Sequence, residues 1–242
     1  MPQNDTPCFE VCVDSPEGLT ACQGIADRIE LCTALDLGGL TPGPGLMQLA
    51  AASGIETHVL IRPRSGDFSL VGEDLDAALQ DIACVRAMGL HGVVIGALSG
   101  TDLDQTALAR LSEAAGDLTT TLHRAFDLVS DQFAALETAI ALGFTRILTS
   151  GGAGSAADGI AQLARLNAAA DGRIQIMAGA GISSGNVAQI TLRTGLRHFH
   201  ASCTKQHALP GPYSSRGFGT HARRPDKAEL RRLHTAINSI GS

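Results

Sequence analysis

Short apolar runs alternate along the chain with longer amphipathic stretches. The runs predict eight strands, over residues 8–14, 26–32, 56–63, 92–98, 118–124, 146–150, 174–178 and 198–202. Between them, hydrophobic positions repeat at helical spacing, most clearly over residues 74–88, 104–115, 131–142, 156–170 and 226–240. Many of these stretches end at a glycine, the usual left-handed stop of a helix. Residues 206–224, rich in Gly, Pro and Ser, predict a long loop before the last helix.

Eight strands that alternate with helices predict an α/β fold, a single (β/α)8 TIM barrel. The chain has 242 residues, close to the ~250 that such barrels need. The alternative is an open, doubly wound sheet, which has the same local pattern. Because no linker or low-complexity segment interrupts the alternation, we expect one domain over residues 1–242.

Composition narrows the classes of function. The net charge of −6 disfavours nucleic acid as a partner. No apolar run approaches the ~20 residues of a membrane span, and the first residues lack the basic and apolar regions of a signal peptide, so we expect a cytoplasmic protein without a membrane partner. A homodimer is the commonest state of soluble oligomers and is the expected assembly. Only Lys205 and Lys227 are available for amine catalysis, which disfavours a Schiff-base mechanism.

Polar residues recur on one face of the predicted strands. In the first strand, Phe9 and Val11 alternate with Glu10 and Cys12. If the apolar face packs against helices, the polar face lines the barrel. Near the carboxyl ends of the strands, where barrel enzymes place their sites, this lining holds Glu10, Glu30, Arg62, His123 and His200. Buried ionisable groups are costly unless they pair or bind something, so a ligand site is expected; the alternative is a self-satisfied network in which Glu10 or Glu30 pairs with Arg62.

Two loops at the same end could bind an anion. Arg62 and Arg64 follow the third strand with Asp67 close behind, and two guanidiniums suit a carboxylate or phosphate. The alternative is a structural turn in which Arg64 pairs with Asp67. Ser150 and Gly151 open a glycine-rich loop before a helix, which supplies backbone N–H groups to anions but is also an ordinary barrel turn.

Two of the six cysteines fall on the inward face. Cys12 and Cys32 lie at the ends of the first and second strands, and neighbouring strands are only ~4.8 Å apart. Two thiolates at this spacing suit Cu(I) or another soft metal. The alternative is a pair of small buried hydrophobic residues.

Several segments resemble the CutC family of copper homeostasis proteins. They are EVCVDS (10–15), ADRIELC (26–32), GGLTPG (38–43), IRPRSGDF (61–68), HGVVIGAL (91–98), LHRAFD (122–127), RILTSGG (146–152) and FHAS (199–202). The resemblance implies a (β/α)8 barrel that handles copper in the cytosol, with Cu(I) held at Cys12 and Cys32. It also marks as family-motif positions Glu10, Glu30, Arg62, Arg64, Asp67, His123, Arg124, Asp127, Ser150 and His200.

Three functions remain open from the sequence. The first is a copper protein with Cu(I) on Cys12 and Cys32. The second is a metal-free enzyme on a small anionic metabolite, with His123 or His200 as general acid and base, Glu10 or Glu30 tuning the pKa of that histidine, and arginines holding the anion. The third is a divalent-metal enzyme with ligands Glu10, Glu30, His123 and His200; the nearby cation of Arg62 disfavours it.

Overall fold

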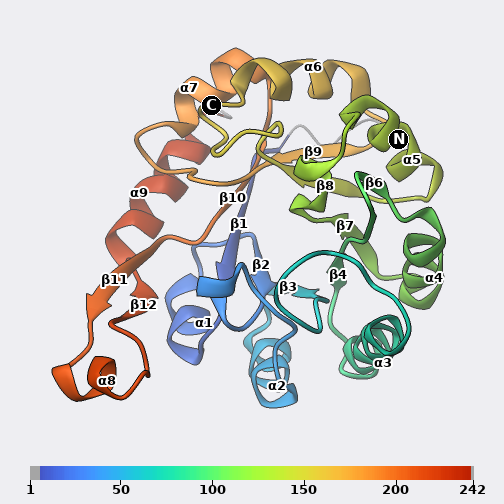
Figure 1. Ribbon diagram of the computed structural model, residues 1–242. Coiled ribbons are helices and arrows are strands. Elements are labelled where there is room, and N and C mark those ends of the chain that lie inside the picture. The colour runs from blue at the N-terminus through green and yellow to red at the C-terminus, as the bar shows by residue number, and fades with distance from the viewer. Residues whose placement is uncertain (1–5, 241–242) are drawn as a thin grey trace.

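The eight predicted strands close into a parallel barrel. The computed structural model describes residues 6–240 and is shown in Figure 1. The barrel strands are β1 (Cys8–Val13), β2 (Arg28–Leu31), β3 (Glu56–Leu60), β4 (Gly92–Ile95), β7 (Thr119–Leu122), β8 (Arg146–Thr149), β9 (Gln175–Ala178) and β10 (His198–Ala201). They pair in this order, and β10 pairs with β1 to close the ring. Closure confirms the (β/α)8 barrel and excludes the open doubly wound sheet.

Helices surround the barrel and cover its outer face (Figure 1). They are α1 (Pro16–Cys22), α2 (Pro44–Ser53), α3 (Glu73–Ala87), α4 (Gln105–Ala115), α5 (Gln132–Ala141), α6 (Ile160–Ala170), α7 (Val187–Thr194) and α9 (Lys227–Asn238). The apolar strand positions pack beneath them, and Phe9, Ile29 and Phe199 are fully buried there. The strands therefore turn their polar positions toward the barrel interior, as the alternation predicted.

Short elements decorate the loops at the carboxyl ends of the strands. Two single-turn 3-10 helices, η1 (Leu35–Leu37) and η2 (Arg124–Leu128), follow β2 and β7. A small hairpin of β5 (Leu98–Ser99) and β6 (Asp102–Leu103) follows β4. These elements bring side chains over the mouth of the barrel.

The predicted loop over residues 206–224 is wrong, because this segment forms a hairpin. Strand β11 (Thr204–Ala208) pairs antiparallel with β12 (His221–Pro225), and the short helix α8 (Gly211–Ser215) lies at the turn. Figure 1 shows this unit, which we call the arm (residues 204–225), projecting away from the barrel. The sequence hid it because both of its faces are exposed, so no apolar alternation marks the strands.

None of the helices within residues 6–240 combines the length and apolar character that crossing a bilayer requires. The remaining residues of the expected domain, 1–5 and 241–242, lie outside the described part of the chain.

Candidate functional site

Strand register stacks the polar residues of the barrel interior in layers. Glu10 lies level with Arg28 on one side and His200 on the other, and Cys12 lies level with Glu30. The layer of Cys12 and Glu30 is nearer the carboxyl ends of the strands. Chemistry at the mouth therefore begins with Cys12 and Glu30, and Glu10 supports it from below.

A pocket of about 120 Å³ opens at this end of the barrel. Most of the residues predicted to converge do so here. Its lining consists of Cys12, Glu30, Leu35, Gly38, Leu60, Arg62, Phe68, His123, Arg124, Leu148 and His200. The volume accommodates an ion or a molecule of a few heavy atoms.

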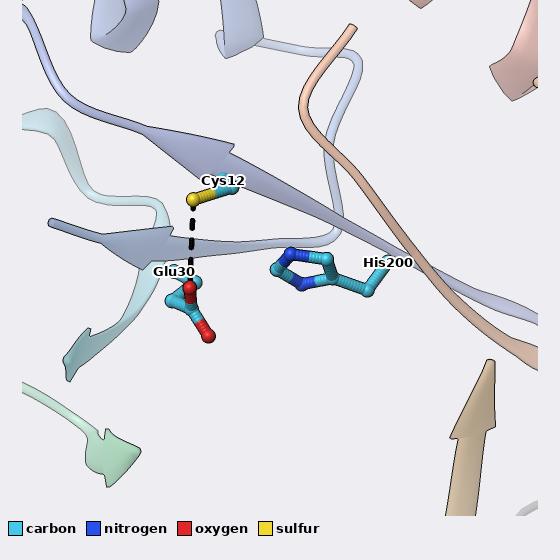
Figure 2. A group of neighbouring side chains, drawn as sticks. All are labelled: Cys12, Glu30 and His200. Atoms are coloured by element: carbon cyan, nitrogen blue, oxygen red, sulfur yellow. Dashed lines mark hydrogen bonds between the residues drawn. The ribbon is translucent and has the colours of Figure 1, made fainter. Parts of the chain in front are cut away.

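Two sulfurs and a carboxylate meet at the pocket, which Cys12 and Glu30 line and beside which Cys32 is fully buried. The Sγ atoms of Cys12 and Cys32 are 3.5 Å apart, and the Cys12 thiol donates to Oε1 of Glu30 at 3.4 Å. One ligand atom from each of Cys12, Glu30 and His200 lies within 4.8 Å of the others. Figure 2 shows the His200 imidazole approaching the other two side chains from the opposite side. The structure thus places side by side residues that the sequence analysis had assigned to separate roles.

The environment raises the pKa values of the thiol and of its carboxylate neighbour. The hydrogen bond with Cys32, followed by burial and the nearby Glu30, raises the pKa of the Cys12 thiol well above its usual range. Burial likewise raises the pKa of Glu30. The second oxygen of Glu30, Oε2, is buried and has no hydrogen-bond partner within residues 6–240. It is therefore available to a ligand.

Glu10 orients His200 and neutralises Arg28. The Oε1 atom of Glu10 is 2.7 Å from Nδ1 of His200, and Oε2 accepts from Nε of Arg28. Burial opposes the charge on Glu10, but Arg28 and His200 outweigh it and lower the pKa of Glu10. Burial also opposes the charge on His200, yet Glu30 and Glu10 raise its pKa. The sequence analysis had offered an ion pair between Arg62 and Glu10 or Glu30 as an alternative to a ligand site. The structure forms such a pair, but between Glu10 and Arg28. Arg28 alternates onto the same face of its strand as Glu30, so the sequence pattern marked it too.

His123 presents a fixed N–H group to the pocket. Its Nδ1 accepts a hydrogen bond from the backbone N–H of Ala125, so in the neutral ring the proton sits on Nε2. Burial, assisted by Arg62, lowers the pKa of His123 to about 4. Nε2 is buried without a hydrogen-bond partner in the described part of the chain. At neutral pH the ring is therefore an uncharged donor.

Arg62 holds the loops around the pocket together. Its Nη1 donates to the carbonyls of Leu37 and Gly39, and its Nη2 donates to the carbonyl of Gly66. The guanidinium carbon lies 4.9 Å from the centre of the Phe68 ring, which also contacts His123 at 4.8 Å between ring centres. Only Nε of Arg62 remains buried and without a partner among residues 6–240. The predicted anion clamp therefore keeps its buried Nε–H for a ligand.

Arg64 and Asp67 lie outside the pocket. Arg64 forms ion pairs with Asp67 at 2.7 Å and with Asp74 at 2.5 Å, near the surface. Asp67 instead borders a neighbouring groove of about 490 Å³. Their geometry matches the structural turn that was the alternative expectation.

A hydrogen-bonded network between two loops, centred on Asp127, includes Arg124, Ser150 and Gly151. The Asp127 carboxylate accepts from the N–H of Ser150 and from Nε of Arg124. Nη2 of Arg124 in turn donates to Oγ of Ser150, and the N–H of Gly151 donates to Oγ1 of Thr149. These backbone N–H groups are already used within the protein. Arg124 alone of the three lines the pocket.

Comparison with known proteins agrees with the resemblance in the sequence. The pattern of the CutC family matches residues 8–205. The chain belongs to the CutC family. A family protein named CutC from Caulobacter vibrioides is 55% identical over 196 residues, 80% of each chain. One from Sinorhizobium medicae is 45% identical over 238 residues, 97% of each chain. Among solved structures, a putative copper homeostasis protein CutC from Streptococcus agalactiae superposes with a TM-score of 0.78 at 32% identity, covering 81% of this chain and 99% of that one.

Proposed function

We propose that this CutC family protein binds Cu(I) through Cys12 and Cys32 and handles copper in the cytoplasm. The observation that carries the proposal is the 3.5 Å separation of the Sγ atoms of Cys12, which lines the pocket, and of the buried Cys32. Thiolates are the ligands that select Cu(I) over harder ions. The cytoplasm keeps such thiols reduced. The relative from Streptococcus agalactiae is named a copper homeostasis protein, which supports copper as the cargo.

The spacing of the sulfurs suits an ion with more than two ligands. With metal–sulfur distances of ~2.3 Å, as in zinc thiolates, a separation of 3.5 Å gives a sulfur–metal–sulfur angle of about 100°. That angle leaves room for a third donor. Glu30 and His200 each have a ligand atom within 4.8 Å of the Cys12 sulfur, and the imidazole is the softer of the two. We expect Cys12, Cys32 and His200 to hold the ion.

An anaerobic Cu(I) titration against a chromophoric chelator tests this proposal. The Cys12→Ser and Cys32→Ser variants should each weaken Cu(I) binding by more than the ~10–100-fold that loss of an outer-shell residue costs. Cys84→Ser is the matched control, because Cys84 is exposed on α3 far along the chain. If the double variant binds Cu(I) as tightly as the parent, copper binds elsewhere and the proposal is wrong.

A second candidate function is a metal-free enzyme that acts on a small anionic metabolite. Three polar atoms that are buried and unpartnered within residues 6–240 belong to the lining of this pocket: Glu30 Oε2, Arg62 Nε and His123 Nε2. Two N–H donors suit an anionic oxygen, and Glu30 or His200 would exchange the proton, because both have raised pKa values.

Ligand-induced thermal stabilisation distinguishes the two candidates. Small phosphates and carboxylates should raise the melting temperature of the parent and of the Cys12→Ser, Cys32→Ser variant alike if the enzyme candidate is right. His123→Gln should abolish that shift. No stabilisation of the folded parent by any such anion excludes this candidate and leaves the copper proposal untouched.

A further inference from the structure

A second pocket, of about 310 Å³, lies at the amino ends of the barrel strands, opposite the site described above. Its lining includes the first residues of β1, β2, β3, β8, β9 and β10, which are Cys8, Arg28, Glu56, Arg146, Gln175 and His198. Barrel enzymes place their chemistry at the other end of the strands, and neither function proposed above uses this pocket. The polar groups gathered here therefore need an explanation of their own.

One edge of the Arg146 guanidinium is left without a partner. The side chain is buried, and its Nη1 donates to Oγ1 of Thr121 at 3.1 Å and to Nδ1 of His58 at 3.2 Å. Within residues 6–240, neither Nε nor Nη2 of Arg146 forms a hydrogen bond. The N–H groups of these two nitrogens point the same way and form the fork that binds two oxygens of an oxyanion.

The charge of Arg146 is not balanced by a carboxylate. Burial, followed by the neighbouring Arg28, lowers the pKa of Arg146 to about 10. Arg28 itself is compensated, because its Nε donates to Glu10. Glu56 lies 3.0 Å from Nε2 of His58 and 3.8 Å from Arg28. Arg146 forms no ion pair among residues 6–240, so an anionic ligand would offset the cost of burying its charge.

Two further polar atoms of the lining are buried and without a partner in the described part of the chain. They are Nδ1 of His198 and Oε1 of Gln175. Gln175 lies level with Arg146 in the register of β8 and β9, and β10, which carries His198, is the next strand of the barrel. Nearly all buried polar atoms in folded proteins have a hydrogen-bond partner. Unpartnered atoms on three consecutive strands of one pocket therefore indicate a ligand.

We propose that this pocket binds a phosphate group, held by the free edge of Arg146, by His198 and by Gln175. The guanidinium edge takes two oxygens, and Nδ1–H of His198 donates to a third. The fourth oxygen of hydrogen phosphate carries a proton, which it donates to Oε1 of Gln175. A carboxylate has two oxygens and, at neutral pH, no proton, so it would leave His198 and Gln175 without partners.

The two carboxylates of the lining do not prevent anion binding. Asp27 is exposed and accepts a hydrogen bond from the N–H of Phe9. Glu56 is half exposed and lies beside His58 and Arg28. Solvent and salt screen exposed charges much more than buried ones. The buried guanidinium therefore dominates the field that a phosphate group meets inside the pocket.

Nuclear magnetic resonance of the full chain with ¹⁵N-labelled histidine tests the proposal, with the His198 signals assigned by their loss in His198→Gln. Inorganic phosphate, added at constant ionic strength, should shift the His198 signals along a saturable curve with a dissociation constant of about 1 mM or below. Sodium acetate should shift them much less. Tighter binding of inorganic phosphate than of glycerol phosphate identifies the free ion as the ligand, and the reverse order identifies a phosphate ester; either order supports the phosphate site.

Two variants separate binding from a structural role. Arg146→Lys keeps the positive charge but removes the fork, so it should raise the dissociation constant about tenfold or more. Gln175→Leu removes an acceptor that has no partner among residues 6–240. It should also weaken phosphate binding, yet it should not lower the melting temperature in phosphate-free buffer, because no hydrogen bond is lost.

Arg232→Lys is the matched control, because Arg232 pairs with Glu229 at the surface of α9, and its phosphate affinity should equal that of the parent. His198 signals that do not respond to phosphate, or that respond equally to acetate, overturn the proposal. So does a phosphate affinity that Arg146→Lys and Gln175→Leu both leave unchanged. Phosphate that shifts the signals of His123 and not those of His198 binds in the pocket at the carboxyl ends of the strands, and this result also overturns it.

Discussion

Replacing Glu10 with Gln tests whether the charge inside the barrel is compensated as the geometry indicates. Glu10 is fully buried and Arg28 is 3% exposed. Gln keeps the size of the side chain but removes its charge. Among residues 6–240, the carboxylate that then remains to the Arg28 guanidinium is that of the half-exposed Glu56, 3.8 Å away. The variant therefore leaves a buried cation without its main partner.

The expected cost is a large part of the stability of the protein. Removing one member of a buried ion pair typically costs about 3–5 kcal/mol, compared with a total of roughly 5–15 kcal/mol for a natural domain. For a chain of this size, that corresponds to a fall in melting temperature of roughly 6–20 °C. The difference should depend on pH. Because the pKa of Glu10 is lowered on folding, its contribution is present above the usual value of ~4.3 and is lost as pH falls through the folded-state pKa.

Thermal and urea denaturation between pH 3 and 8 measure both effects. Glu137→Gln is the control, because Glu137 pairs with Arg173 at the exposed surface, and its midpoint should match that of the parent. The difference between the parent and Glu10→Gln should be greatest near neutral pH and should narrow below about pH 4. A Glu10→Gln variant as stable as the parent at pH 7 would refute the assignment of Glu10 as the compensating charge.

Three further changes test the surroundings of the pocket. Gly96→Ala should displace the imidazole of His123, because a Cβ there would lie 2.3 Å from its Cε1, whereas Gly45→Ala meets nothing within 4 Å; melting temperatures and crystal structures compare the two. The lowered pKa of His123, about 4, means that the protein loses about 3 kcal/mol as pH falls from ~6.5 to ~4; the His123→Gln variant should lose less, and NMR titration should find the ring neutral above pH 5. Asp127→Ala removes the carboxylate that accepts hydrogen bonds from several N–H groups, including that of Gly152. The variant should lower the free energy of unfolding by about 1–3 kcal/mol and speed hydrogen exchange at Gly152.

The alternation of inward-facing and outward-facing positions along the strands predicted most of the site that could be inferred from the sequence. The alternation placed Cys12, Glu30, His123 and His200 inside the barrel, and the structure gathers all four around one pocket or its floor. The face to which each side chain points depends only on the geometry of a strand, which is why it can be inferred without a structure. It does not say how neighbouring strands are aligned.

Register and loop conformation account for what the sequence left undetermined. Glu10 was expected at the mouth, but the alignment of β1 with β2 sets it level with Arg28, one layer down. Arg64 was expected to bind an anion, yet carboxylates of its own loop and of α3 hold it near the surface. Such contacts depend on residues distant along the chain, which local patterns do not encode.

The copper proposal requires that the Cys12 thiol lose its proton. The Cys12 thiol has a pKa well above its usual range, so an incoming Cu(I) ion must displace its proton. The nearest base is Glu30, whose Oε1 already accepts the hydrogen bond from that thiol and whose own pKa is raised. A carboxylate of raised pKa beside the thiol can take the proton as the sulfur binds the metal, and Oε2, which is buried and unpartnered within residues 6–240, gives the acid thus formed a second position for it. If the copper proposal holds, copper affinity should increase with pH, and Glu30 would accept the proton that the Cys12 thiol gives up.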